Sequence, residues 1–276
     1  MKGDTVVLNY DIYNNGLREW VVFLHGIGGK NDTFSAQIDK FSKEYNLLLI
    51  ELPWHNSSPF PYKNINPKNL SKEIKKVLDF VKIENAHFVA LSLGTIVLSH
   101  FSTIYPEYIK TMTLTSSAIE VTLFLKYIIM LVYPFKWLLP YKIIYNVAVY
   151  LVAPQKKYKS IRKLYTDEFD RMNRRHIVAW VDYMIYVLFP KKTVKNMKKL
   201  FKGRVKFISG SKDTFFLKGS KRTASKITDG EIDILDGCCH VCNLDGAELY
   251  NKKVLSFIKE HNKDNKNIPI DIEREI

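Results

Sequence analysis

An α/β fold with a mostly parallel central sheet is the fold class that the sequence predicts. Two observations support it. Short apolar runs bounded by turn residues alternate with segments of helical pattern, an order that favours right-handed crossovers and helices on both faces of a parallel sheet. The hydrophobic content of 46% over 276 residues is enough to fill the core of such a fold.

Six apolar runs are typical of buried strands. They are EWVVFLH (19–25), YNLLLIEL (45–52), AHFVAL (86–91), IKTMTLTS (109–116), GRVKFISG (203–210) and GEIDILDG (230–237). Helical patterns lie between these runs or after the last, at 33–44, 68–82, 93–105, 217–227 and 245–261. Because ligands of parallel sheets bind beyond the carboxyl ends of the strands, functional residues are expected directly after each run.

Four of these strand ends carry residues that suit nucleophilic catalysis. HGIGG (25–29) follows the first strand, SLG (92–94) the third, GSKD (210–213) the fifth and CCHVC (238–242) the sixth. In order they provide backbone amides, a serine, a carboxylate and an imidazole. A serine hydroxyl needs a histidine to take its proton, and the histidine needs an acid to fix its tautomer. The chain order serine, aspartate, histidine fits such a site.

The segment around Ser92 resembles the nucleophile elbow of the α/β-hydrolase superfamily, and the resemblance covers nearly the whole chain. The family motif G-x-S-x-G reads A-L-S-L-G here (90–94), with alanine at a position that mainly requires little bulk. A serine at this position disfavours the family members that use an aspartate nucleophile. The resemblance implies an α/β-hydrolase fold with a helical cap inserted after the strand that follows the elbow.

The resemblance also implies roles for individual residues. Ser92 matches the nucleophile, Asp213 the acid after the penultimate strand and His240 the general base after the last strand. The backbone amides of Ile27 and Leu93 match the oxyanion hole. The histidine of the early His-Gly loop, at position 25, is then structural.

The resemblance to the α/β-hydrolase superfamily also implies domain boundaries. The hydrolase core is expected at 1–118 and 203–262, the helical cap at 119–202 and a polar tail at 263–276. The first half of the cap is strongly apolar, but lysines and prolines interrupt it before it reaches the roughly 20 residues that a membrane-spanning helix needs.

Three side chains are candidates for the substrate pocket. ELPWHNSSP (51–59) resembles a family loop D-x-P-G-x-G-x-S, and Trp54 stands where a glycine is usual, so it either narrows the pocket or packs against the loop. Trp180 and Met184 lie on an amphipathic pattern in the cap, for which packing on the core is an equally open explanation.

Alternatives stay open for the acid and for the cysteine segment. Asp233, Asp236 or Glu120 could replace Asp213 as the acid. The three cysteines, all within 238–242, do not form a disulfide framework. They could bind a soft metal with the histidine, but a second ligand cluster is missing, and packing around the histidine loop is expected instead. No metal and no cofactor are predicted.

The charge of the chain is concentrated in the cap. Residues 121–202 carry 17 basic and 4 acidic side chains, so that +13 of the net charge of +14 lies there. Such a surface attracts anions, and peripheral contact with an anionic membrane is one expectation; a solvated lysine-rich face is the other. Nucleic acid is not expected as a partner. The polar N-terminus lacks the apolar stretch of a secretory signal, and a cytoplasmic location is expected.

A serine hydrolase of the carboxylesterase or lipase type, acting on lipophilic esters such as monoacylglycerols, fits these observations best. The same triad also serves lyases, thioesterases and acyltransferases, among them an enzyme of menaquinone biosynthesis. A non-catalytic member that binds a ligand or a membrane is the third possibility.

Overall fold

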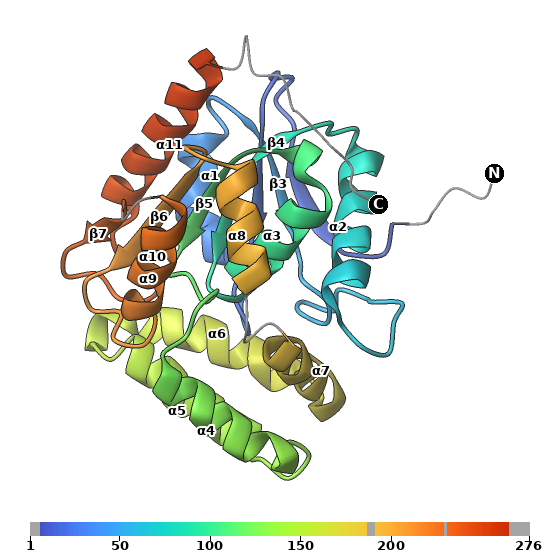
Figure 1. Ribbon diagram of the computed structural model, residues 1–276, viewed down its shortest axis with the longest axis vertical. Coiled ribbons are helices and arrows are strands. Elements are labelled where there is room, and N and C mark those ends of the chain that lie inside the picture. The colour runs from blue at the N-terminus through green and yellow to red at the C-terminus, as the bar shows by residue number, and fades with distance from the viewer. Residues whose placement is uncertain (1–5, 187–190, 229–230, 265–276) are drawn as a thin grey trace.

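A seven-stranded sheet of order β1-β3-β2-β4-β5-β6-β7 forms the centre of the computed structural model, which describes residues 6–186, 191–228 and 231–264. Its strands are β1 (Tyr10–Tyr13), β2 (Trp20–Leu24), β3 (Asn46–Ile50), β4 (Ala86–Leu91), β5 (Ile109–Thr115), β6 (Val205–Gly210) and β7 (Asp233–Leu235). Within this sheet β1 runs antiparallel to β3 and all other neighbours are parallel (Figure 1). The predicted mostly parallel sheet is confirmed.

The central strands are buried on both faces, which explains their continuous apolar sequences. Every residue of β3 and β4 is buried. The edge strand β1, YDIY, is largely exposed and was not predicted, because four residues of mixed polarity do not produce a strand signal. The parallel register pairs Leu91 with Thr115 and Gly210 with Leu235, so the loops after these strands emerge at one edge of the sheet.

Helices cover the sheet on both faces. One layer contains α1 (Ser35–Phe41) and α11 (Ala247–Asp264), and the short α10 (Cys242–Asp245) packs beside them. The other contains α2 (Pro67–Val81), α3 (Leu93–Ile104), α8 (Lys191–Leu200) and α9 (Leu217–Ile227), each packed against the next. The sequence of α2 explains why it is helical and where it begins. Asn66 and Asn69 form a capping box, proline occupies the first turn, and the face with Leu70, Ile74 and Val77 is buried.

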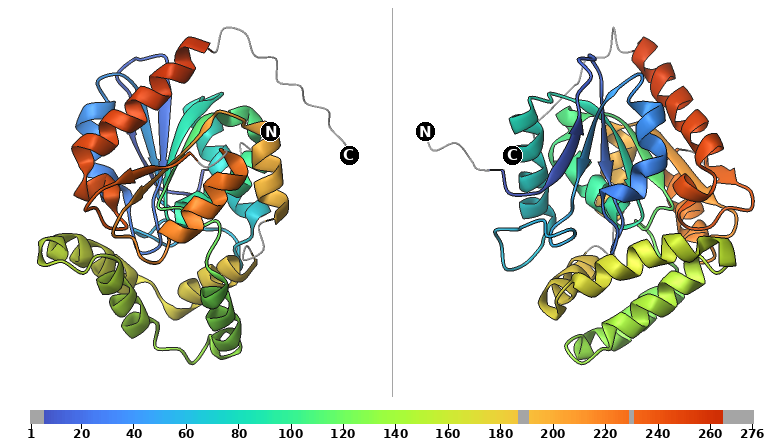
Figure 2. Two further views of the ribbon diagram at one scale, coloured as in Figure 1. Left: turned by 60° about the vertical axis from the view of Figure 1, so that its left-hand side comes forward. Right: turned by 180° about the vertical axis from the view of Figure 1, so that it is seen from behind.

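Four helices extend across the carboxyl ends of the strands. They are α4 (Leu123–Val132), α5 (Tyr141–Val152), α6 (Lys159–Arg171) and α7 (Arg174–Tyr186). Figure 2 shows them as a separate group on one side of the sheet, with α4 and α5 forming two arms that meet at the far end of the molecule. The segment expected as cap also includes α8, which packs against α3 and α9 on the sheet. Residues 265–276 of the predicted tail lie outside the described residues.

Candidate active site

Ser92 occupies a strained turn between β4 and α3. Its backbone has φ 51° and ψ −115°, a conformation that side chains other than glycine rarely adopt. The turn is held in place because the Ser92 amide donates to the carbonyl of Thr115 (3.0 Å), and the Ser92 carbonyl accepts from the amide and the hydroxyl of Thr95 (2.9 and 2.6 Å). The strained turn agrees with the predicted elbow at Ser92, which is 8% exposed and lines a cavity.

Small residues around the turn allow β4, α3 and the loop after β2 to approach closely. A Cβ atom at Gly94 would lie 2.2 Å from the carbonyl oxygen of Leu24, and a Cβ at Gly26 would lie 3.2 Å from the Cβ of Ser92. The second glycine of the elbow motif is thus required by the contact between α3 and β2. This contact also brings the loop of residues 25–29 next to the serine.

Asp213 and His240 form a buried hydrogen-bonded pair at the same edge of the sheet. The Nδ1 of His240 lies 2.8 Å from Oδ2 of Asp213, and Oδ1 of Asp213 accepts from the amide of Phe216 (3.1 Å). An ionised carboxylate only accepts hydrogen bonds, so Nδ1 carries the proton and Nε2 is left as the acceptor. The aromatic ring of Phe216 packs against the imidazole at 4.6 Å between ring centroids.

The carboxyl of Asp213 stays ionised despite its burial. Desolvation acts to raise its pKa, but the charge of His240 and the hydrogen bonds from His240 and Phe216 outweigh it, so that the pKa lies below its ordinary value. A negative charge at this position stabilises a positive charge on the imidazole, which is what a base needs after it accepts a proton.

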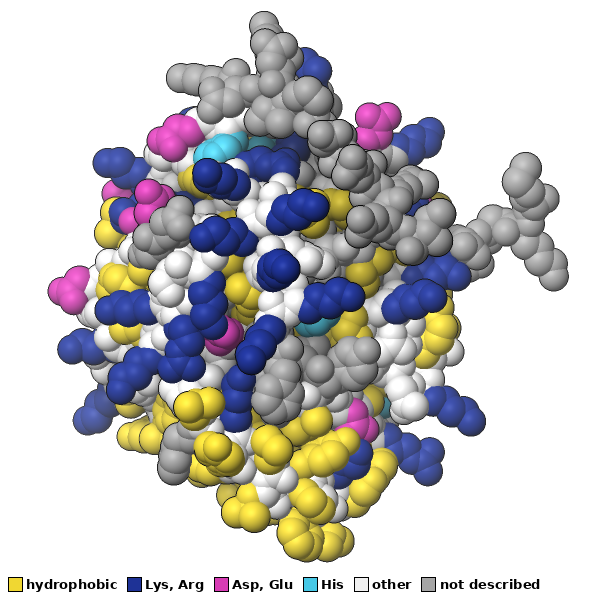
Figure 3. All heavy atoms as spheres, in the orientation of Figure 1, with side chains coloured by type: hydrophobic (Ala, Val, Ile, Leu, Met, Phe, Trp, Pro, Cys, Tyr) yellow, Lys and Arg dark blue, Asp and Glu magenta, His cyan; other side chains and the backbone are white. Residues whose placement is uncertain are grey.

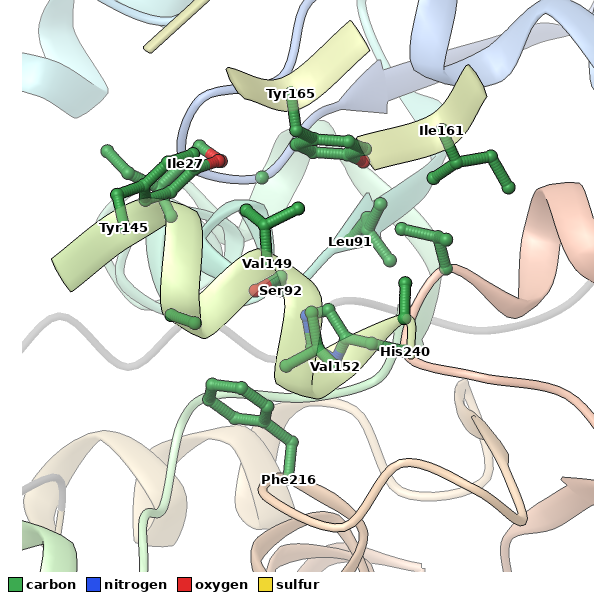
Figure 4. Close-up of a pocket in the computed structure, with 14 residues that line it drawn as sticks. Ile27, Leu91, Ser92, Tyr145, Val149, Val152, Ile161, Tyr165, Phe216 and His240 are labelled. Carbon is green, nitrogen blue, oxygen red and sulfur yellow. The ribbon is translucent and has the colours of Figure 1, made fainter. Parts of the chain in front are cut away.

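Ser92 and His240 line one cavity. Its volume is about 170 Å³, and Figure 4 shows the two side chains beside each other in its wall, with Val149 and Val152 of α5 around them. No hydrogen bond joins the Ser92 hydroxyl to the imidazole within residues 6–186 and 231–264. Proton transfer between them therefore requires one of the side chains to turn, as is common in sites without substrate.

The amides expected as the oxyanion hole lie close to the serine. Ile27 and Leu93 line a second cavity of about 170 Å³ together with Ser92. Among the residues that the structure describes, neither amide donates a hydrogen bond, so both are free to bind a developing negative charge. The loop that carries Ile27 is held from two sides: the hydroxyl of Tyr145 donates to the carbonyl of Ile27 (2.7 Å), and the amide of Gly28 donates to Nε2 of His55 (3.0 Å).

The fold assignment rests on this arrangement together with a sequence match. A family model described as the α/β hydrolase fold matches residues 19–138, which include β2 to β5 and the turn at Ser92. The chain has the α/β-hydrolase fold. The likeness is clearer in the structure than in the sequence, since sequence identities to the solved structures are low.

Two solved structures illustrate the likeness. A carboxylesterase structure from Nitrososphaera gargenis has a TM-score of 0.77 and 17% identity, covering 93% of this chain and 96% of its own. The enol-lactonase from Burkholderia xenovorans LB400 has a TM-score of 0.75 and 17% identity, covering 91% and 96%. The dihydrolipoyllysine-residue acetyltransferase component of the acetoin cleaving system from Cupriavidus necator is 27% identical over 101 residues, which span 37% of this chain and only 27% of that relative.

The imidazoles of His25 and His55 hold the loop of residues 25–29 in place through hydrogen bonds. The Nδ1 of His25 donates to the carbonyl of Gly26 (2.8 Å), Nε2 accepts from the amide of Leu52 (3.0 Å), and Oε2 of Glu51 lies 3.1 Å from that nitrogen. Burial holds the pKa of His55 well below its ordinary value, so His55 is neutral. Sequence reasoning missed His55; its only signal is its place directly after a strand, within the loop at 51–59.

The competing acids have partners elsewhere in the protein. Glu120 accepts from Lys226 (2.5 Å), Asp233 pairs with Lys206 and Lys253, and Asp236 accepts from Ser211 (3.1 Å). Asp213 is the acid that contacts His240 in the described structure. The sequence pattern left these carboxylates open, because each lies in or shortly after a predicted strand; Asp233 is the first residue of β7.

One of the three candidate pocket residues, Met184, lines a cavity at Ser92, and the two tryptophans do not. Met184 lines the second cavity with Ile96 and Ile129. The expectation that Trp54 and Trp180 line the pocket is wrong for both cavities. Trp54 has φ 63° and stacks on His176 at 4.4 Å between ring centroids, and Trp180 is fully buried, where its indole donates to the carbonyl of Pro53 (3.1 Å). Their rings therefore join α7 to the loop at 51–59 instead of facing the substrate.

The three cysteines are free thiols within a hydrophobic cluster behind the histidine loop. Cys238, Cys239 and Cys242 are buried among residues such as Leu235 and Tyr250. Burial raises the pKa of all three thiols, that of Cys239 to about 11. Thiols in this state act as small apolar side chains, in agreement with their expected packing role.

Proposed function

We propose that the protein is a serine hydrolase that cleaves carboxylic esters through an acyl-enzyme. The Ser92 hydroxyl attacks the ester carbonyl and its proton passes to Nε2 of His240, while Asp213 holds the Nδ1 proton. The amides of Ile27 and Leu93 bind the oxyanion. His240 then donates the proton to the leaving alcohol, and a water activated by the same nitrogen releases the acid and frees Ser92.

The observation that carries this proposal is the buried Asp213–His240 hydrogen bond, which leaves Nε2 as an acceptor in a cavity that Ser92 also lines. A packing role alone does not require an ionised carboxylate to be buried against an imidazole. The strained backbone at Ser92 is a second, independent support, since such strain is retained mostly at functional positions.

The two cavities support a substrate with apolar groups on both sides of the ester. They share Ile27, Ser92 and Phe216, and extend from the serine in two directions, one lined mainly by α5 and the other by α3 and Met184. One cavity then takes the acyl chain and the other the alcohol. Their nearly apolar walls favour lipophilic esters, with monoacylglycerols among the candidates.

Labelling with a fluorophosphonate tests the reaction class. Wild-type protein is expected to react, because only a serine activated by a base is nucleophilic enough at neutral pH. Ser92→Ala is expected to abolish labelling and to lower ester hydrolysis by at least about 10³-fold. Ser99→Ala is the matched control, since Ser99 is buried on the same helix and its hydroxyl contacts the carbonyl of Ile96 and the ring of His100, not His240. An unlabelled wild type, or a labelled Ser92→Ala, contradicts the proposal and favours a non-catalytic member.

A chain-length series of nitrophenyl esters tests the substrate class. We expect kcat/KM to rise from acetate towards medium acyl chains, because each buried methylene contributes about 0.8 kcal/mol. A preference for acetate with no gain for longer chains contradicts the lipophilic substrate. Faster turnover of thioesters, or transfer to an added alcohol instead of water, points to the thioesterase or acyltransferase alternatives.

A further inference from the structure

The far side of the cap exposes most of the large apolar side chains found on the protein surface. Fourteen of the 21 exposed large hydrophobic residues among the described side chains lie between Leu123 and Leu151. Figure 3 shows apolar side chains gathered at the end of the molecule where Figure 1 places α4 and α5. We name the exposed hydrophobic side chains of residues 123–151 the apolar cap surface. Soluble monomers rarely expose so contiguous a set without a partner.

The composition of this surface matches the boundary region of a bilayer. At its far end Phe135, Trp137 and Leu138 are 58%, 52% and 80% exposed. Aromatic side chains prefer the level of the lipid headgroups, and aliphatic ones lie deeper. Within the described residues no helix is both long and apolar enough to cross a membrane, so contact is limited to the surface.

The charge around the apolar cap surface is predominantly positive, although Asp182 and Asp170 pair with Lys136 and Lys142. Residues 121–166 contain eight lysines and arginines and no aspartate or glutamate. The pKa of Lys126, which lies in α4, is lowered chiefly by burial, while the charge of Glu120 acts to raise it. In a symmetric contact with a second copy these basic rims would face each other and repel. An anionic lipid surface attracts them instead.

We propose that the apolar cap surface docks on membranes that contain anionic lipid, with the ends of α4 and α5 inserted at the headgroup boundary. Helix α5 connects this surface to the reaction site: its outer side chains Ile144, Val147 and Leu151 are exposed, whereas Tyr145, Val149 and Val152 line the cavity at Ser92. When the protein is docked, α5 lies between the lipid and the cavity. It does not depend on the proposed reaction, and Ser92→Ala is expected to dock like the wild type.

Sedimentation with vesicles tests the proposal. Wild-type protein is expected to bind vesicles of phosphatidylcholine and phosphatidylglycerol more than pure phosphatidylcholine vesicles, and less in high salt. The double variant Leu131→Glu, Leu138→Glu places charges at side chains that are 75% and 80% exposed and should lower binding at least about tenfold. Phe80→Glu is the matched control, because Phe80 is 66% exposed on α2, away from the cap, and should bind like wild type.

A second measurement does not depend on the folding of the charged variant. Brominated lipid is expected to quench part of the tryptophan fluorescence of the wild type, and Trp137→Phe should remove that part. Circular dichroism and the melting temperature check that the glutamate variants fold.

The proposal is overturned if the wild type does not sediment with mixed vesicles, or if the double variant binds like Phe80→Glu. It is also overturned if the wild type is a dimer that the double variant dissociates, because the surface is then an interface between copies.

Discussion

Among several carboxylates of similar chemistry, the position of Asp213 in the fold makes it the partner of His240. Four carboxylates lie in or shortly after strands of the sheet, but among them Asp213 is the one buried beside an imidazole, while Glu120 and Asp233 pair with lysines. Its pKa is held below the ordinary value, so the carboxyl stays ionised over the neutral and mildly acidic range. This charge fixes the Nδ1 proton of His240 and keeps Nε2 available as a base.

Replacement of Asp213 tests this role. Asp213→Asn should lower kcat by about 10³- to 10⁴-fold, because an amide can donate to Nδ1 and then favours the tautomer whose Nε2 carries the proton. The measurement is steady-state hydrolysis of a short nitrophenyl ester. Asp236→Asn should retain wild-type activity, since Asp236 contacts Ser211 and not the imidazole. Equal activity of the two variants would show that the acid lies elsewhere.

At the scale of elements, the site depends on the close approach of helix α3 to strand β2. Gly94 lies in the first turn of α3 and faces the carbonyls of Leu24 and His25 at the end of β2. This approach brings the amides of Ile27 and Leu93 to the same side of Ser92. The second glycine of the elbow motif is therefore a packing requirement, and the geometry of the oxyanion hole follows from it.

Gly94→Ala tests this packing. Its Cβ would lie 2.2 and 2.8 Å from two backbone oxygens, so β2 or α3 must shift, and the free energy of unfolding should fall by about 3 kcal/mol. Gly203→Ala is the comparison: Gly203 has φ +75° with nothing within 4 Å, and the cost should be near 1 kcal/mol of backbone strain. Urea denaturation measures both. Similar losses of unfolding free energy in the two variants would mean that α3 and β2 can move apart at little cost, which contradicts the packing requirement at Gly94.

For the whole molecule, buried neutral histidines link stability to pH. His87 lies inside the sheet, where it bonds to Thr111 and Asn262 (both 2.8 Å), and burial lowers its pKa to about 4. Between pH 6.5 and 4 the unfolded chain binds a proton at this residue that the folded chain does not, so the free energy of unfolding falls as the pH falls. His55 and His100, whose pKa values are also lowered by burial, act in the same direction.

The expected loss from His87 over this range is about 3 kcal/mol. His87→Gln keeps a donor and an acceptor but cannot titrate, and should reduce the slope of unfolding free energy against pH by about one proton between pH 6.5 and 4. Urea unfolding at a series of pH values measures the slope. An unchanged slope in His87→Gln would assign the pH dependence to other groups.

Much of the fold and the principal site residues could be predicted from the sequence, because their signals are local. An apolar run is buried wherever it forms a strand, and a serine between a strand and a helix is placed by the turn itself at the carboxyl end of the strand, so β2 to β7 and Ser92 follow from neighbouring residues. The edge strand β1 has no such signal, since its partner β3 lies far along the chain.

The tertiary structure alone decided which distant side chains meet. It selected Asp213 over Glu120, Asp233 and Asp236, and it turned the ring of Trp180 towards the loop at 51–59, because these choices depend on distances between segments that are far apart in sequence. It also decided that α5 presents one apolar face to the cavity and another to solvent. A hydrophobic pattern shows which side chains avoid water, but not which surface they contact.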